Sequence, residues 1–141
     1  CRHPRIRPLA RAQDEFPEDP ALMQTRELGR FGEEQAAKYL RRKGYTVTAR
    51  NFSCRAGEID IIAEDKDFVV FAEVKLRRDA AFAEAREFVT PAKQRRIINT
   101  ARLWLGMNDC EKQPRFDVIE VYAPRGALGR VSINHIENAF M

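Results

Sequence analysis

The sequence predicts an α/β fold in which a central mixed sheet is flanked by helices, as a three-layer α/β/α domain. Short runs of β-branched and aromatic residues alternate with two longer segments whose apolar residues recur at helical spacing. The strand-like runs are apolar on both faces, which is typical of a sheet covered by helices on both sides. We expect the order helix, three strands, helix, strand, with a terminal strand added. In this order the second helix crosses over and brings the fourth strand in parallel.

Length and composition set the class of protein. The chain has 141 residues, which is enough for one domain with a real core. Its net charge of +4 permits a nucleic-acid partner without demonstrating one. No apolar run approaches the ~18 residues of a transmembrane helix, so no membrane span is expected. The cysteines are odd in number and lack C-x-x-C spacing, which indicates neither a disulfide framework nor a zinc site and favours a reducing cytoplasm.

Residues 1–24 differ in composition from the rest of the chain. They contain four of the seven prolines, and a group of arginines precedes a group of acidic residues. No apolar segment of the kind found in secretory signals is present among them. We expect a flexible tail over residues 1–24 and one folded domain over residues 25–141.

The first helix is expected over Thr25–Lys43, with Gly44 at its C-terminal cap. At about 100° per residue, four small or apolar residues form one stripe of this helix, and Glu33 lies in its middle. The stripe consists of Gly29, Ala36, Ala37 and Leu40. An acid on a packed stripe indicates either a functional residue or a partly buried glutamate with its own partner, and the sequence leaves both open.

Glu34 follows directly and points about 100° away on the helical wheel. It lies near Arg30 and Arg41, where an ordinary surface ion pair is expected. Glu33 and Glu34 are therefore adjacent and chemically identical, but we expect them to have different surroundings.

Five strands are expected along the rest of the chain, with the second helix between the third and the fourth. The strands are Tyr45–Phe52, Gly57–Ala63, Phe68–Lys75, Arg115–Tyr122 and Arg130–Ile136. Thr90 and Pro91 form an N-cap and N1 pair for the second helix, which runs to about residue 105 or 106. Residues 79–89 are rich in alanine and glutamate, so they form either a helix or a mobile loop.

The second and third strands each carry an acidic residue in an otherwise apolar run. The second contains Gly57-Glu58-Ile59-Asp60, and the third ends in Glu73-Val74-Lys75. Because side chains alternate between the two faces of a strand, Glu73 and Lys75 share one face. Asp60 and Glu73 are expected in or beside the core, where an unpaired charge is costly.

Two carboxylates about 4 Å apart repel each other by roughly 4 kcal/mol at an effective dielectric constant of about 20. A divalent cation between Asp60 and Glu73 would turn this repulsion into binding. With Lys75 beside them, two acids that hold Mg²⁺ or Mn²⁺ can orient a water molecule and stabilise charge on a phosphodiester. The alternative is that Glu73 and Lys75 are an ion pair at an exposed strand end.

Several short motifs follow one another along the chain. They are Gly32-Glu33 in the first helix, Gly-Glu-Ile-Asp, Glu-Val-Lys, a lysine-bearing second helix, and Arg-Phe-Asp-Val-Ile from Arg115. Over about residues 26–137, this combination resembles the bacterial YraN-like family of predicted endonucleases. That family is similar to archaeal Holliday-junction resolvases and belongs to the PD-(D/E)XK nuclease superfamily. The resemblance implies a restriction-endonuclease-like core, although Ile59 precedes Asp60 where the superfamily's namesake motif has proline.

The resemblance also implies roles for four residues. Asp60 and Glu73 would be metal ligands, Lys75 the catalytic lysine, and Glu33 the acid contributed by the first helix. Lys93 and Gln94 fall where related nucleases carry a helix residue near the site. We therefore expect a Mg²⁺- or Mn²⁺-dependent endonuclease that acts on structured or branched DNA. Seven basic residues are candidates for phosphate contacts, and a solvated surface explains most of them equally well. These are Arg50, Arg55, Arg77, Arg78, Lys93, Arg95 and Arg96.

Two other functions stay open. The domain can be a binding module that grips nucleic acid or a protein with little or no catalysis, or a phosphoesterase that acts on another substrate. We also expect that the protein acts as a homodimer, with an apolar edge formed by Val118, Val121 and Tyr122, which are otherwise plain core residues.

Overall fold

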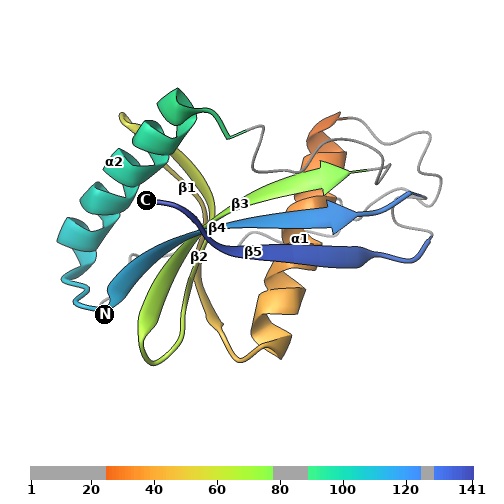
Figure 1. Cartoon of the computed structure of the whole chain (residues 1–141), viewed down its shortest axis with the longest axis horizontal. Helices are drawn as coiled ribbons and strands as arrows, with labels where there is room; N and C mark the ends of the chain where they lie inside the picture. The colour runs from red at the N-terminus through yellow and green to blue at the C-terminus, as the bar shows by residue number, and fades with distance from the viewer. Residues whose placement is uncertain (1–24, 78–88, 125–128) are drawn as a thin grey trace.

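The computed structural model describes residues 25–77, 89–124 and 129–141 of the chain (Figure 1). The elements are α1 (Thr25–Arg42), β1 (Thr46–Cys54), β2 (Gly57–Glu64), β3 (Phe68–Arg77), α2 (Pro91–Asn108), β4 (Gln113–Tyr122) and β5 (Ser132–Phe140). The predicted order of helices and strands is confirmed, and each element lies within a few residues of its expected bounds. The expected tail over residues 1–24, Arg78 and most of the segment 79–89 lie outside the described residues.

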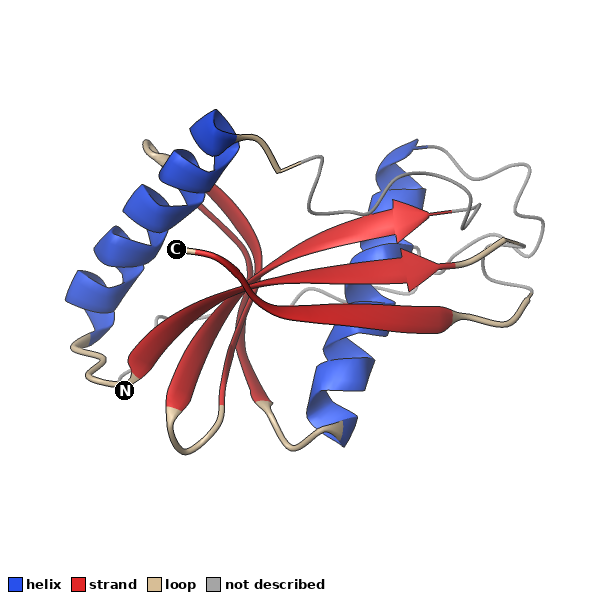
Figure 2. Ribbon diagram, in the orientation of Figure 1, coloured by secondary structure: helices blue, strands red, loops and turns tan. Residues whose placement is uncertain are grey.

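The strands form one sheet in the order β1-β2-β3-β4-β5 (Figure 2). β3 and β4 are parallel, and the other neighbouring strands are antiparallel. The first three strands are therefore a meander, and α2 lies in the crossover that parallel strands require. The β2–β3 ladder is short, from Ile61↔Ala72 to Glu64↔Val69, so the first part of β2 pairs only with β1.

The two helices lie on opposite sides of the sheet, which confirms the three-layer architecture (Figure 1). On the α1 side, the core includes Ala36, Ala37, Leu40, Ile61, Val70 and Ile119. On the α2 side, it includes Ile62, Phe71, Ile97, Ala101, Trp104 and Val118. Full burial of an aliphatic or aromatic side chain stabilises a fold by about 1.5–3 kcal/mol. Among the described residues, no helix is long and apolar enough to cross a membrane.

The packed stripe of α1 differs from the prediction at its start. Gly29 is exposed, and a Cβ atom there would meet nothing within 4 Å. Gly32 packs on the sheet instead, since a Cβ atom there would lie 3.4 Å from the Cβ of Leu76. The stripe therefore runs at four-residue spacing from Gly32 to Leu40, and Glu33 lies beside it.

α2 begins and ends at residues that suit these positions. The Thr90 hydroxyl accepts a hydrogen bond from the backbone N of Lys93 at 3.2 Å, and Pro91 follows, as predicted. The helix ends at Asn108, because Asp109 is in the left-handed region with φ 48° and its N–H donates to the Leu105 carbonyl. The first turn of α2 is thereby fixed in place, and with it Lys93.

The residues expected to form an apolar dimer edge belong to the core. Val118 and Val121 are 0% exposed, and the hydroxyl of half-buried Tyr122 donates to Glu120 Oε2 at 2.7 Å. This prediction was wrong because β4 is an interior strand, between β3 and β5, with both of its faces covered.

Candidate active site

Asp60 lies where β2 separates from β3. The ladder between these strands ends at Ile61↔Ala72. Beyond that pair, Asp60 Oδ2 accepts a hydrogen bond from the backbone N of Val74 at 2.8 Å, in place of a backbone carbonyl. β3, the strand that carries Glu73, therefore also fixes the position of the Asp60 carboxylate.

Glu73 lies on β3 and contacts two lysine side chains. Its Oε1 is 2.5 Å from Lys93 Nζ and 3.4 Å from Lys75 Nζ. The Glu73 side chain is 9% exposed, so both ammonium groups lie at the mouth of a nearly buried carboxylate. The sequence predicted Lys75 here, but Lys93, expected among the phosphate contacts, reaches closer from the first turn of α2.

Glu33 approaches the same group of acids from α1. Burial raises its pKa, and the negative charges of Glu58 and Glu73 add to this effect. A hydrogen bond from the Asn51 side chain and the charge of Arg50 oppose it. Within the described part of the chain, Glu33 Oε1 is buried and has no hydrogen-bond partner. Glu33 therefore faces the site with an acceptor that the fold leaves unused.

The crowded charges alter protonation throughout the site. Burial, followed by the negative charge of Glu73, raises the pKa of Asp60 to about 8. The hydrogen bond from Val74 N acts in the opposite direction and lowers that pKa. Burial lowers the pKa of Lys75, and the neighbouring Lys93 ammonium adds to this. Burial also acts to lower the pKa of Lys93, but the hydrogen bond and charge of Glu73 outweigh it, so that pKa is raised.

A cavity of about 430 Å³ between the β1–β2 hairpin, β3 and α2 brings together Asp60, Glu73 and Lys93. It is lined by Gly57, Glu58, Asp60, Glu73, Lys93, Arg96 and Ile97. A Cβ atom on Gly57 would lie 3.1 Å from the hydroxyl of Thr100, so a glycine lets the hairpin lie close against α2. The wall of the cavity thus depends on the first residue of the Gly-Glu-Ile-Asp motif.

The donor set of this cavity fits a hard divalent cation. Mg²⁺ prefers oxygen ligands and is commonly held by one or two carboxylates, with water and phosphate in the other positions. Asp60 and Glu73 supply two carboxylates to the cavity, and Glu33, with its buried Oε1, lies outside the cavity lining but close enough to act on the charge of Asp60. Across the described residues, no group of three or more His, Cys, Asp and Glu side chains is arranged to hold a metal ion. The chain would therefore provide two ligands and leave the rest to solvent and substrate.

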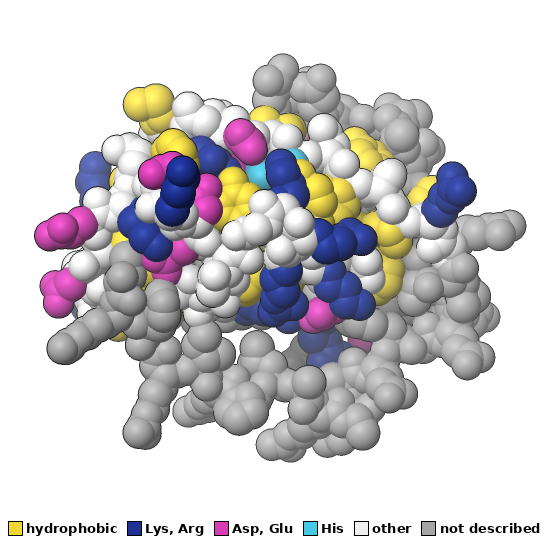
Figure 3. Space-filling view, turned by 90° about the horizontal axis from the view of Figure 1, so that it is seen from below, with side chains coloured by type: hydrophobic (Ala, Val, Ile, Leu, Met, Phe, Trp, Pro, Cys, Tyr) yellow, Lys and Arg dark blue, Asp and Glu magenta, His cyan; other side chains and the backbone are white. Residues whose placement is uncertain are grey.

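The other candidate phosphate contacts do not gather in the cavity. Arg96 lines it, whereas Arg55 and Arg95 are exposed elsewhere. Arg77 is half-buried at the end of β3, and Arg78 lies outside the described residues. On the face of the molecule seen in Figure 3, Lys and Arg side chains lie at several places among acidic and apolar ones.

Arg50 is held by Glu34. Its Nη1 lies 2.7 Å from Glu34 Oε2, and the two side chains are only 18% and 32% exposed. The structure thus pairs Glu34 with β1, whereas the helical wheel suggested Arg30 or Arg41 of its own helix. A helical wheel shows only the positions of residues within one helix, so it does not show that β1 packs along α1 and brings Arg50 to Glu34.

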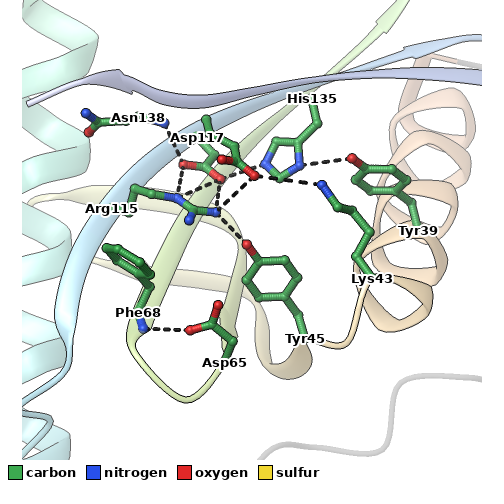
Figure 4. Close-up of polar contacts among 10 residues, drawn as sticks. Tyr39, Lys43, Tyr45, Asp65, Phe68, Arg115, Asp117, His135 and Asn138 are labelled. Carbon is green, nitrogen blue, oxygen red and sulfur yellow. Dashed lines mark hydrogen bonds and ion pairs between the residues drawn. The ribbon is translucent and has the colours of Figure 1, made fainter.

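A second polar cluster lies on the α1 side of the sheet and was not foreseen (Figure 4). Asp117 is fully buried and accepts hydrogen bonds from Arg115 Nε at 2.9 Å and from the backbone N of Asn138 at 3.0 Å. His135 Nε2 lies 2.6 Å from Asp117 Oδ2, and His135 Nδ1 lies 3.1 Å from the Tyr39 hydroxyl. This cluster joins α1, β4 and β5.

Comparison with known proteins places the chain in a family. A model of the family described as "Uncharacterised protein family UPF0102" matches residues 32–121. A UPF0102 protein of Caldanaerobacter subterraneus subsp. tengcongensis is 43% identical over 114 residues, which cover 80% of this chain and 93% of that protein. A UPF0102 protein of Symbiobacterium thermophilum is 45% identical over 117 residues, which cover 82% and 98%. The chain therefore belongs to the UPF0102 family, which is the YraN-like family that its motifs resemble.

Proposed function

We propose that this protein is a Mg²⁺- or Mn²⁺-dependent endonuclease that hydrolyses phosphodiester bonds in structured or branched DNA. The observation that carries the proposal is the convergence of Asp60 and Glu73 on one cavity, beside lysines from β3 and α2. Neighbouring carboxylates removed from water are costly unless a cation lies between them. The resemblance to the PD-(D/E)XK nuclease superfamily supports the same reaction.

Five side chains in or beside the cavity have a role in this proposal. Asp60 and Glu73 would hold the cation, and Glu33 would complete the site directly or through water. When bound, the cation would supply a Lewis acid for a phosphoryl oxygen and for the attacking water. Lys75 would orient that water, and the burial that lowers its pKa makes proton exchange with the water less costly. Lys93 would contact the phosphate.

A nucleic-acid- or protein-binding module with little or no catalytic activity is the second candidate. It is favoured by the contacts of Glu73, whose charge is already balanced by Lys93 and Lys75 without a metal ion. Such a module would hold DNA equally well with a chelator present, and removal of Asp60 would not change its affinity.

A cleavage panel with the purified protein tests the proposal. Duplex, flap, four-way junction and single strand are each compared in Mn²⁺ and in EDTA. We expect cleavage of branched substrates in Mn²⁺ only, and a rate at least about 10²-fold lower for Asp60→Asn and for Glu73→Gln. Cleavage by these variants at the wild-type rate would contradict the assignment.

Glu64→Gln is the matched control for Glu73→Gln. Glu64 is also a buried strand glutamate, 4% exposed, and it pairs with Lys112 at 3.0 Å. It also accepts a hydrogen bond from the Thr48 hydroxyl at 2.7 Å and lies at the opposite end of β2 from the cavity, so its substitution disturbs a buried acid–lysine pair away from the cavity. We expect Glu64→Gln to cleave at the wild-type rate.

A further inference from the structure

The regular alternation of side chains is broken in both strands of the β1–β2 hairpin. Adjacent strand residues normally point to opposite faces, so residues three apart do as well. Ala49 and Phe52 nevertheless both pack in the core on the α2 side, and so do Ile59 and Ile62. Asn51 lies within the first of these intervals and has a left-handed backbone with φ 52°. The register shift of this strand pair lies earlier, between Val47 and Ala49, so the change of face at Asn51 is a kink of the backbone within an unbroken register.

The kink faces Asp60. The Cα pairs on either side of it are Arg50↔Ile61 and Phe52↔Ile59. Asn51 is thus opposite Asp60, at the point where β2 leaves β3 and the Asp60 carboxylate bonds to Val74 N. Asn is one of the few residues other than glycine that accepts a left-handed backbone without a large penalty.

The kink also lets two consecutive residues of β1 contact two consecutive residues of α1. Arg50 binds Glu34 at 2.7 Å, and the Asn51 side chain hydrogen-bonds to Glu33. In a regular strand, only one of Arg50 and Asn51 would point toward α1. The Glu33 carboxylate, which lies near Glu58 and Glu73, is therefore tethered to the residue that turns the hairpin.

We propose that Asn51 is a positioning residue of the candidate active site, whose left-handed backbone turns the hairpin at Asp60 and whose amide holds Glu33 near Asp60 and Glu73. This inference rests on the proposed function, because it concerns the geometry of the cation site. Asn51 touches neither substrate nor cation and acts through Glu33 and Asp60.

Substitution by glycine separates the amide from the backbone. Asn51→Gly keeps the positive φ and removes the hydrogen bond to Glu33. Substitution of a residue that orients a metal ligand typically lowers metal affinity about 10- to 100-fold. We therefore expect Asn51→Gly to bind Mn²⁺ about tenfold more weakly, with little change in melting temperature. Mn²⁺ binding is measured by isothermal titration calorimetry without DNA, and folding by circular dichroism.

The chain offers a matched control at Asn138. This asparagine is also exposed and left-handed, with φ 51°, but belongs to the Asp117 cluster (Figure 4). Asn138→Gly keeps the backbone N–H that bonds to Asp117, and we expect wild-type Mn²⁺ affinity. Equal losses in both glycine variants would overturn the proposal.

A double-mutant cycle tests whether Asn51 acts through Glu33. In a Glu33→Gln background, Asn51→Gly should weaken Mn²⁺ binding by much less than it does in the wild type. If the two substitutions lower the Mn²⁺ binding free energy additively, Asn51 does not act through Glu33. If Asn51→Gly does not fold, Asn51→Asp replaces it, because aspartate tolerates the same backbone but cannot donate to Glu33 when ionised. An affinity at or above the wild-type value would then overturn the proposal.

Asp60→Asn separates failure of this inference from failure of the proposed function. If Asp60→Asn abolishes Mn²⁺ binding but Asn51→Gly binds like the wild type, only the role of Asn51 is wrong. If the wild-type protein binds no Mn²⁺, the proposed function and this inference are both wrong.

Discussion

Asp117 and Asp60 are the same residue type on two strands of one sheet, but their surroundings act on them in opposite directions. Burial acts to raise the pKa of Asp117, but hydrogen bonds from His135 and Arg115 outweigh it, so that pKa is lowered. Burial raises the pKa of Asp60 as well, and there the nearby Glu73 adds to the effect. The Asp117 cluster faces α1 and supplies donors, whereas the Asp60 cavity faces α2 and gathers acids.

This difference separates an acid that stabilises the fold from an acid that we propose binds a cation. Asp117 receives donors from two strands and stabilises their junction. Asp60 has one backbone donor and is crowded by carboxylates, an arrangement that lowers stability unless a cation joins it. Perturbed carboxylates of the second kind gather at sites where chemistry is done.

The largest expected effect is on the unfolding free energy, which replacement of the two aspartates should change in opposite directions. Asp117→Asn should cost about 3–5 kcal/mol of unfolding free energy, because it leaves a largely buried Arg115 with only the longer ion pair to Glu137, at 3.9 Å. Asp60→Asn should instead raise the unfolding free energy in EDTA at neutral pH, because folding then no longer requires Asp60 to take up a proton that the unfolded chain has lost. Urea denaturation measures both. A similar loss of stability in the two variants would contradict the distinction.

The pH dependence should also have opposite signs. The folded state keeps the Asp60 proton up to about pH 8, while the unfolded chain loses it at about pH 4. Asp60 should therefore lower stability progressively as pH rises between these values. The lowered pKa of Asp117 should contribute stability that is present above its unfolded pKa and lost as pH falls through its folded pKa.

Thermal melts in EDTA across this pH range test these signs. Asp60→Asn should flatten the fall in melting temperature between about pH 5 and 8, and the variant should converge with the wild type near pH 4. If the difference between wild type and Asp60→Asn does not change with pH, Asp60 does not carry the raised pKa.

The smallest expected effects separate two neighbours on α1. Glu34→Gln should lose its ion pair with Arg50, worth at most about 1 kcal/mol, and leave Mn²⁺ affinity and cleavage intact. Glu33→Gln keeps nearly the same volume, so the fold should survive while Mn²⁺ affinity or cleavage falls. Titration calorimetry and the cleavage panel compare the pair. Matched affinity and activity in the two variants would remove Glu33 from the site.

Local patterns in the sequence predicted most of the fold and the centre of the site. Alternating apolar residues located β2 and β3, so Asp60 and Glu73 could be placed on neighbouring strands before the fold was known. The capping pair Thr90-Pro91 located the start of α2. These features depend on residues close together in the chain, which is why a single sequence shows them.

Contacts between distant elements were not predictable in this way. The resemblance placed Lys93 near the site, but its contact with Glu73 depends on how α2 docks beside the end of β3, and that docking leaves no local pattern. Asp117 and His135 are brought together only when β5 pairs with β4. The kink at Asn51 did leave a signal, an asparagine inside a run of strand residues, but the signal is weak without the facing strand.

Binding of Mn²⁺ to the metal-free protein, measured by isothermal titration calorimetry, tests the central claim most directly. We expect the wild-type protein and Glu64→Gln to bind Mn²⁺ alike, with an affinity that rises between about pH 6 and 8 as Asp60 gives up its proton. Asp60→Asn and Glu73→Gln should show no binding at this site. Failure of the wild-type protein to bind Mn²⁺, or equal binding by Asp60→Asn, would contradict the account of the Asp60 cavity as a cation site.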